Sequence, residues 1–231
     1  MFDAARTEKY DKAFLSENFM GPNAVLLIDE ITQGISLKAD MRVLDLGCGT
    51  GLTSVFLARE YGVQVFAVDL WISATDNFRR IQKTGTQGLV IPIHTDTTLG
   101  LPFADEYFDA LVSIDSYHYY GNNDEFFGEK LKPLLKKSAP VAIAVPGTKI
   151  EHGGVIPEEL KPFLDAEGFA TLHSMDWWAG ILEKHLDDFT IGEMECTDQA
   201  WADWLASDNP YAKQDVEMMA AGNDKILNLI A

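Results

Sequence analysis

Short apolar runs alternate with amphipathic segments through the first two thirds of the chain. Five runs are almost continuously apolar, and they cover residues 42–47, 63–70, 88–96, 108–115 and 139–147. Segments with apolar residues at helical spacing follow the first two runs, at 52–62 and 74–84. Strands that are apolar along their length are usually buried on both faces, so this alternation predicts an α/β fold with a parallel sheet between helices.

Two further features of the pattern refine this picture. Pro92 lies inside the third run, and because proline has no N–H to donate to a neighbouring strand, we expect that strand at an edge of the sheet. The last third predicts helices over 156–168, 174–185 and 198–222, with a late strand over 188–196. No repeat or low-complexity linker divides the chain, so residues 1–231 are expected to form one domain with a helical elaboration from about 147 onward.

Composition mainly excludes partners. The formal net charge is −18 and the pI is about 4.5, so the chain repels phosphate backbones and anionic membranes, and neither nucleic acid nor a membrane surface is an expected partner. An acidic composition is usually explained by selection for solubility or by a salty habitat. Selection for cationic substrates is the alternative explanation. The N-terminus shows no apolar signal segment, and no apolar run could span a bilayer, which predicts a cytoplasmic protein of unspecified oligomeric state.

The cysteines indicate neither a disulfide nor a metal site. Cys48 and Cys196 stand alone, and the chain contains no C-x-x-C or H-E-x-x-H motif. Zinc and disulfide frameworks need such spacings, so we expect no metal.

Candidate chemistry begins at the end of the first strand, in "VLDLGCGTG", with Asp45 followed by Gly47, Gly49 and Gly51. A strand, a glycine loop and a helix in succession present backbone N–H groups to an anionic ligand. The loop is not a P-loop, because no Lys follows Gly51, and it lacks the third glycine of the dinucleotide fingerprint, where Leu52 stands. A tight turn without a ligand is the alternative.

Asp69 ends the second strand, 22 positions after Gly47. An acidic residue at about 20 positions is expected to bind the hydroxyls of a ribose. The alternative is an Asp that caps a helix N-terminus without binding a ligand. Spacing alone does not separate NAD from another adenosine ligand.

Four segments in order resemble the class I S-adenosylmethionine-dependent methyltransferases, particularly the small-molecule enzymes of the "type 11" group. They are "VLDLGCGTG", "VFAVDL", "HTDTTLGLPFADEYFD" and "ALVSIDSYHYY". The resemblance covers about residues 20–146, the expected cofactor-binding core. It implies a Rossmann-like, seven-stranded, mostly parallel sheet in the order 3-2-1-4-5-7-6 with strand 7 antiparallel. That order puts strand 3 at an edge, as Pro92 does, and the last strand would still be continuing at "KILNLIA".

The resemblance also implies how S-adenosylmethionine is bound. Asp45 would face its ammonium and Asp69 its ribose, with Leu70 and Trp71 beside the adenine and Asp96 accepting from the adenine amino group. The implied cofactor-binding residues are Asp45, Gly47, Cys48, Gly49, Gly51, Asp69, Leu70, Trp71, Asp96, Thr97 and Asp115.

The methyl acceptor is expected beyond strand 4, which ends in "SIDSYHYYG", because open α/β sheets bind ligands at the carboxyl ends of their strands. His118 is the candidate for orienting or deprotonating the acceptor, with Asp115 as its partner. A purely structural histidine is the alternative. Aromatic residues of the C-terminal part would form a lid over the acceptor or would pack in the core. The candidate acceptor-binding residues are Tyr10, Met20, Tyr117, Tyr120, Trp177 and Trp178.

The sequence therefore predicts methyl transfer from S-adenosylmethionine to a small-molecule acceptor. A non-catalytic S-adenosylmethionine-binding protein is one alternative. An NAD-dependent oxidoreductase is another, disfavoured by Asp45 and Leu52.

Overall fold

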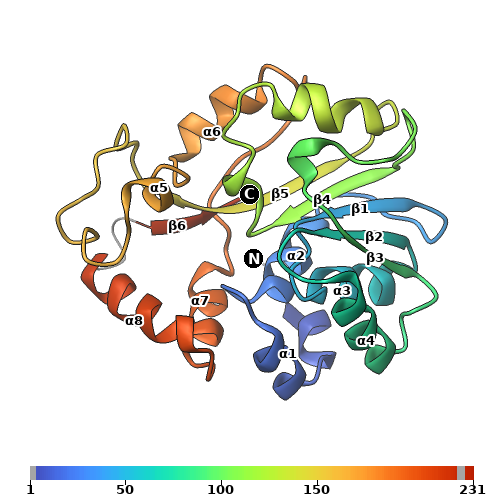
Figure 1. The fold of residues 1–231 in the computed structure, drawn as a ribbon, viewed down its shortest axis with the longest axis horizontal. Coiled ribbons are helices and arrows are strands. Elements are labelled where there is room, and N and C mark those ends of the chain that lie inside the picture. The colour runs from blue at the N-terminus through green and yellow to red at the C-terminus, as the bar shows by residue number, and fades with distance from the viewer. Residues whose placement is uncertain (1–3, 223–226) are drawn as a thin grey trace.

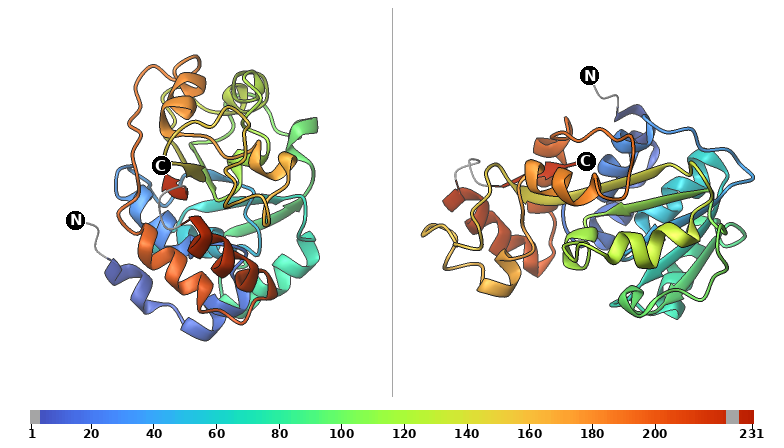
Figure 2. Two further views of the ribbon diagram at one scale, coloured as in Figure 1. Left: turned by 90° about the vertical axis from the view of Figure 1, so that its left-hand side faces the viewer. Right: turned by 90° about the horizontal axis from the view of Figure 1, so that it is seen from above.

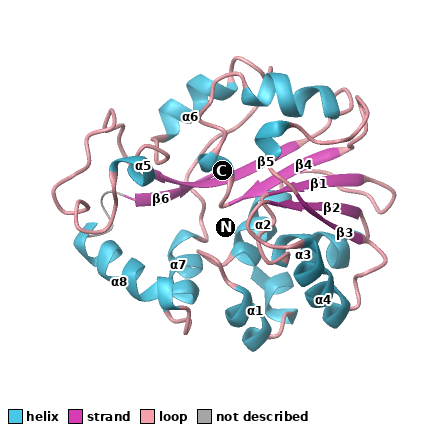
Figure 3. Ribbon diagram, in the orientation of Figure 1, coloured by secondary structure: helices cyan, strands magenta, loops and turns pink. Residues whose placement is uncertain are grey.

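A computed structural model describes residues 4–222 and 227–231. One sheet crosses the molecule with helices on both faces (Figure 1, Figure 3). The strands are β1 (Arg42–Leu46), β2 (Gln64–Asp69), β3 (Val90–His94), β4 (Ala110–Ile114), β5 (Val141–Thr148) and β6 (Leu227–Ile230). The α-helices are α1 (Lys12–Asn18), α2 (Ala24–Thr32), α3 (Leu52–Tyr61), α4 (Ala74–Thr84), α5 (Ala166–Phe169), α6 (Met175–Leu182), α7 (Thr197–Leu205) and α8 (Pro210–Gly222). Short helical turns of other types are η1 (Ala4–Lys9), η2 (Thr97–Leu99), η3 (Tyr117–Tyr119), η4 (Phe127–Leu131) and η5 (Lys132–Leu134).

The strand order is β3-β2-β1-β4-β5-β6. The first five strands are parallel, and β6 runs antiparallel to β5. The Rossmann-like order is therefore confirmed, with β6 in the place expected for strand 7. β3 pairs with β2 at the edge of the sheet, which confirms the position that Pro92 predicts.

The expected strand over 188–196 is wrong, and the described residues form six strands, not seven. Only a fragment of the segment lies beside β6, where Glu193 forms an isolated antiparallel bridge with Ile230. The fragment ends there because the Glu30 carboxylate accepts hydrogen bonds from the backbone N–H groups of Glu195 and Cys196, both at 2.8 Å. These bonds direct the chain away from the sheet edge and into α7.

Prolines divide the C-terminal elaboration more than the sequence pattern predicts. The expected helix over 156–168 is reduced to the single turn of α5, because Pro162 lacks an N–H and disfavours helical geometry in the residue before it. The expected helix over 198–222 is broken into α7 and α8, with Pro210 as the first residue of α8. α6 forms as expected, and the Ser174 hydroxyl caps it by accepting from the Trp177 N–H at 3.4 Å.

Two apolar layers enclose the sheet. One face packs against α2, α3 and α7, and the other packs against α6 and the turns between 126 and 135. The glycine loop follows β1 at the carboxyl edge of the sheet, where β2 and β4 also end. In the described part of the chain, no helix combines the length and the apolar character that a membrane span requires.

Candidate functional site

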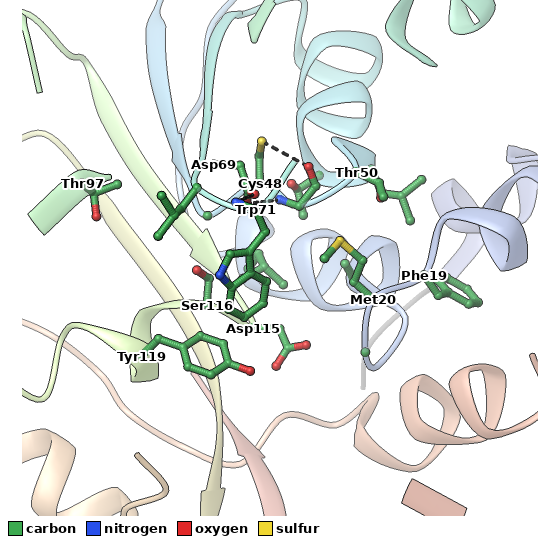
Figure 4. A pocket seen from close by; sticks show the side chains of 18 of the residues that line it. Phe19, Met20, Cys48, Thr50, Asp69, Trp71, Thr97, Asp115, Ser116 and Tyr119 are labelled. Carbon is green, nitrogen blue, oxygen red and sulfur yellow. Dashed lines mark hydrogen bonds between the residues drawn. The ribbon is translucent and has the colours of Figure 1, made fainter. Parts of the chain in front are cut away.

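A pocket of about 270 Å³ lies beyond the carboxyl ends of the central strands (Figure 4). Its lining residues belong to five segments, 18–24, 47–53, 69–71, 96–98 and 114–120, although not every residue of these segments faces the pocket. Ligands of open α/β sheets bind at this edge. The fold therefore brings the four separate sequence motifs together around one cavity.

The backbone of the glycine loop forms one wall. Gly47, Gly49 and Gly51 have positive φ angles of 73°, 52° and 86°. A Cβ on Gly47 would stand 1.8 Å from Ser116 Oγ, and one on Gly49 would stand 3.0 Å from Met20 Sδ. Gly47 is therefore required for close packing, whereas the flexible Met20 side chain could move away from Gly49. Gly51 has open space around it and is the N-cap of α3.

Asp69 connects this loop to the end of β2. Its Oδ2 accepts a hydrogen bond from the Gly49 N–H at 2.8 Å, and its Oδ1 accepts from the N–H groups of Trp71 and Ile72, both at 2.8 Å. The cap of α4 is Ser73, so Asp69 is not the helix cap considered as an alternative. A carboxylate has about four acceptor positions, and three are occupied, which leaves room for one further donor.

Asn77 binds the carbonyl group of the same loop residue. This residue of α4 is buried and donates from Nδ2 to the Gly49 carbonyl at 2.8 Å. Together, Asn77 and Asp69 fix the orientation of the Gly49 backbone. Sequence reasoning missed Asn77, because an Asn inside a helix carries no signal of a distant contact.

Asp45 lies beneath the loop and does not line the pocket. Its carboxylate is completely buried, and its Oδ2 accepts from the hydroxyls of Thr53 and Ser54 at 2.6 and 2.5 Å. Burial raises the pKa of Asp45 to about 6, and the two hydroxyls act in the opposite direction. No described residue donates to its Oδ1, so one buried acceptor atom is free below the loop.

The residues expected beside adenine line the pocket. Leu70 and Trp71 are exposed at its mouth, and Thr97 is buried in its wall. Asp96 Oδ1 accepts from the Thr98 hydroxyl at 2.6 Å and from the Thr98 N–H at 2.9 Å, which lowers the pKa of Asp96. This carboxylate is therefore held in its charged form on the rim of the pocket.

Asp115 lies in the wall opposite, next to the N-terminal segment. Its backbone has a φ of 54°, which is unusual outside glycine. A Cβ on Gly21 would stand 2.2 Å from Asp115 Oδ2, so glycine is required there to make room for the carboxylate. Burial, with a smaller contribution from Asp215, raises the pKa of Asp115 to about 8.

His118 does not reach this pocket. Its ring is buried and packs behind Tyr119, with the ring centroids 4.0 Å apart. Burial lowers the pKa of His118 to about 3, so the imidazole is neutral at ordinary pH. Tyr119 lines the pocket, and its ring lies 5.1 Å from the ring of Trp71 (Figure 4).

The other candidates fall into two groups. The expected residues that line the pocket are Met20, Gly47, Cys48, Gly49, Asp69, Leu70, Trp71, Asp96, Thr97, Asp115 and Tyr120. The expected residues that do not line it are Tyr10, Asp45, Gly51, Tyr117, His118, Trp177 and Trp178. Tyr117 and Trp178 pack together in the apolar layer on the other face of the sheet, and Tyr10 stacks on Phe56. Their roles in acceptor binding stay predictions.

The C-terminal elaboration reaches the pocket indirectly, through α7 and α8. Asn23 Nδ2 donates to Asp203 Oδ2 of α7 at 2.7 Å, and Asn209 Nδ2 donates to the Phe19 carbonyl at 3.2 Å. Figures 1 and 2 show α7 beside the N-terminal helices, with α8 on the far side of α7. α7 and α8 hold the segment 18–24, which forms one wall of the pocket. Among residues 4–222 and 227–231, no group of three or more His, Cys, Asp or Glu side chains could hold a metal ion.

Comparison with protein families agrees with this geometry. Residues 43–138 match the model of a methyltransferase domain. Over 166 residues the chain is 28% identical to the glycine/sarcosine/dimethylglycine N-methyltransferase of Actinopolyspora halophila, covering 71% of this chain and 28% of that protein. Over 129 residues it is 29% identical to the O-methyltransferase resE of Aspergillus sclerotiorum, covering 56% of this chain and 48% of that protein. The chain therefore spans less than half the length of either relative.

Solved structures share the fold. Phosphoethanolamine N-methyltransferase 2 of Haemonchus contortus, in complex with phosphomonomethylethanolamine and S-adenosylhomocysteine, superposes with a TM-score of 0.71 at 20% identity. The superposition covers 99% of this chain and 59% of that chain.

Proposed function

We propose that the protein transfers a methyl group from S-adenosylmethionine to a small-molecule acceptor, and the match of residues 43–138 to the model of a methyltransferase domain supports this proposal. The observation that carries this proposal is the fixed glycine loop. Gly49 is held at its N–H by Asp69 and at its carbonyl by Asn77, at the edge of the sheet where the cavity lies.

The residues around the cavity fit this cofactor. Asp69 keeps one acceptor position for a ribose hydroxyl, and Asp96 keeps a charged carboxylate on the rim for an amino group. The Cβ-free surface at Gly47 and Gly49 lets the chain backbone approach a ligand closely. The free acceptor atom of Asp45 lies below the loop, where it favours a positive charge at the amino-acid end of the cofactor.

When bound, S-adenosylmethionine supplies an electrophilic methyl group on a sulfonium. The protein itself has to align the acceptor and to exclude water. Correct positioning of the acceptor removes a large part of the activation barrier to methyl transfer. The N-terminal segment 18–24 and Tyr119 enclose the acceptor side, and Tyr119 packs against Trp71 beside the adenine. Asp115 is the polar group placed there to hold an acceptor or to accept its proton. His118 acts behind it by fixing Tyr119.

Relatives named as N- and O-methyltransferases support a small-molecule acceptor. A non-catalytic S-adenosylmethionine-binding protein would use the same loop, and turnover separates the two. The test has two parts. Calorimetry against S-adenosylmethionine, S-adenosylhomocysteine and NAD should detect the first two ligands alone. Incubation with a panel of amines, thiols and phenols should then release S-adenosylhomocysteine with at least one acceptor. Tight cofactor binding without turnover across the panel would favour the binding protein.

A further inference from the structure

We propose that the methyl acceptor is a cationic amine, held against Asp115 and the exposed ring of Tyr119, which packs on Trp71. This inference rests on the proposed methyltransferase function and names its substrate class. The arrangement of charge in the pocket wall carries it.

The wall contains carboxylates and no cationic side chain. Asp69, Asp96 and Asp115 line the pocket, and the described lining residues include no Lys, Arg or His. Asp69 and Asp96 are assigned to the cofactor, so Asp115 is the lining carboxylate left on the acceptor side, and a phosphorylated or carboxylate acceptor would find no counter-charge there. A cationic acceptor would instead find a carboxylate of opposite charge.

Asp115 is the carboxylate without a partner. No hydrogen bond or ion pair to its side chain is formed by the described residues, in contrast to Asp69 and Asp96. Its backbone is left-handed, and the missing side chain of Gly21 makes room for its carboxylate in the wall. A carboxylate that is kept in a cavity without a donor is set to receive one from a ligand.

A second carboxylate comes from α8, far along the chain. Trp204 Nε1 donates to Asp215 Oδ2 at 2.7 Å and so fixes its position. The charge of Asp215 contributes to raising the pKa of both Asp115 and Tyr119. Two neighbouring carboxylates repel each other unless one is protonated or a cation lies near them, and an ammonium group would relieve the repulsion.

The aromatic pair completes the site. Trp71 and Tyr119 are 64% and 51% exposed, and their rings meet at 5.1 Å. Aromatic faces attract ammonium and methylammonium groups through cation–π contacts. Figure 4 shows Asp115 beside these two rings. Carboxylates and aromatic faces together favour an amine over a neutral acceptor of the same shape.

Methyl transfer requires the ammonium nitrogen to lose a proton first. The bound ammonium favours the charged form of Asp115, whose own proton leaves to solvent. One ammonium N–H bond then breaks and its proton passes to the Asp115 carboxylate. The freed nitrogen lone pair forms the new bond to the methyl carbon, and the carbon–sulfur bond breaks with its electron pair on sulfur. The products are the methylated ammonium ion, which now carries the positive charge that sulfur has lost, the protonated Asp115 carboxyl and the neutral thioether S-adenosylhomocysteine.

Choline and its neutral isostere 3,3-dimethylbutan-1-ol probe the site by charge alone. With S-adenosylhomocysteine saturating, we expect choline to bind the wild-type protein about tenfold more tightly than the alcohol. Asp215→Asn should weaken choline binding by about fivefold and leave the alcohol unchanged. Glu217→Gln is the matched control, since it removes one negative charge from an exposed position of the same helix. This variant should bind choline and the alcohol with wild-type affinities.

Three results would overturn the proposal. One is equal affinity of the wild-type protein for choline and the alcohol, a measurement that needs no variant. Another is an Asp215→Asn protein in which choline binding is intact but S-adenosylmethionine weakens relative to S-adenosylhomocysteine, which would assign the carboxylates to the sulfonium. The third is turnover of phenols or thiols with no turnover of any amine. Failure of S-adenosylhomocysteine to bind at all would instead contradict the proposed function.

Discussion

The backbone N–H of Gly49 donates a hydrogen bond to Asp69 Oδ2 at 2.8 Å. This bond joins the loop after β1 to the end of β2. The two features that the sequence singles out separately are thus one structural unit. A change at Asp69 should therefore affect the loop as well as any ribose bound there.

The first prediction concerns Asp69. Asp69→Ala should weaken S-adenosylmethionine binding by about tenfold or more, because hydrogen bonds to a charged group contribute about 1.5–3 kcal/mol each. Asp69→Asn should also weaken it, because its NH₂ group would face backbone N–H donors on one side or the other. Isothermal calorimetry measures both affinities.

Asp76→Ala is the control for this series. It removes a carboxylate from an exposed position of α4 that contacts Ser73 and Arg79, away from the pocket. The affinity of Asp76→Ala for S-adenosylmethionine should match that of the wild-type protein. Unchanged binding by Asp69→Ala would remove Asp69 from the cofactor site.

The second prediction concerns Gly47. Gly47→Ala should destabilise the protein by about 2 kcal/mol, because a left-handed backbone costs about 1–2 kcal/mol outside glycine, and the new Cβ would also displace Ser116. Cofactor affinity should fall with it. Gly88→Ala should have little effect, because nothing lies within 4 Å of the added atom. Urea unfolding of the two variants tests this, and equal stabilities would show that the loop relaxes freely.

The third prediction separates packing from proton chemistry at His118. The ring is buried behind Tyr119 and outside the pocket lining, so His118→Phe should keep kcat/KM within about threefold of wild type. His118→Ala leaves a cavity behind Tyr119 and should lower kcat/KM by about tenfold. Neither should change the pH profile. Equal, large losses in both variants, with S-adenosylhomocysteine binding intact, would instead assign a chemical role to the imidazole.

Much of the sheet could be predicted because its signals are local. Buried strands are apolar along their length, and a single proline without an N–H marks the edge strand. The lost strand near Glu193 shows the limit of such reasoning. Its pattern suits a strand, but Glu30, far away in the sequence, binds the following backbone N–H groups.

The site could be predicted in part for the same reason. Asp69 and the glycines stand in motifs with characteristic spacing. Asn77 and Asp215 stand in helices whose surface pattern says nothing of what lies opposite them. Trp177 and Trp178 suggested a lid, yet Trp178 packs on the other face of the sheet. Sequence periodicity shows that a side chain is buried but not which layer buries it.

The fourth prediction concerns the pH dependence of stability through Asp115. Its pKa is raised to about 8 in the folded protein by burial and by Asp215, and it is about 3.9 in an unfolded chain. Between these values the folded protein keeps a proton that the unfolded chain has lost. The contribution of Asp115 is therefore complete below about pH 4 and is lost as the pH rises to about 8. Asp115→Asn removes this dependence.

The free energy of unfolding of Asp115→Asn minus that of wild type should thus grow from about pH 4 to 8 and then level off. Asp215 from α8 and Tyr119 from η3 face this carboxyl and are present in both proteins.

Asp109→Asn is a control in which the difference in the free energy of unfolding should change with pH in the opposite direction. Burial opposes ionisation of Asp109, but the Arg42 N–H and Lys136 outweigh it and lower its pKa. That variant should lose stability relative to wild type at neutral pH and recover the difference in acid. Urea titrations across this range measure both, and a flat difference for Asp115→Asn would mean that its carboxyl stays ionised in the wall.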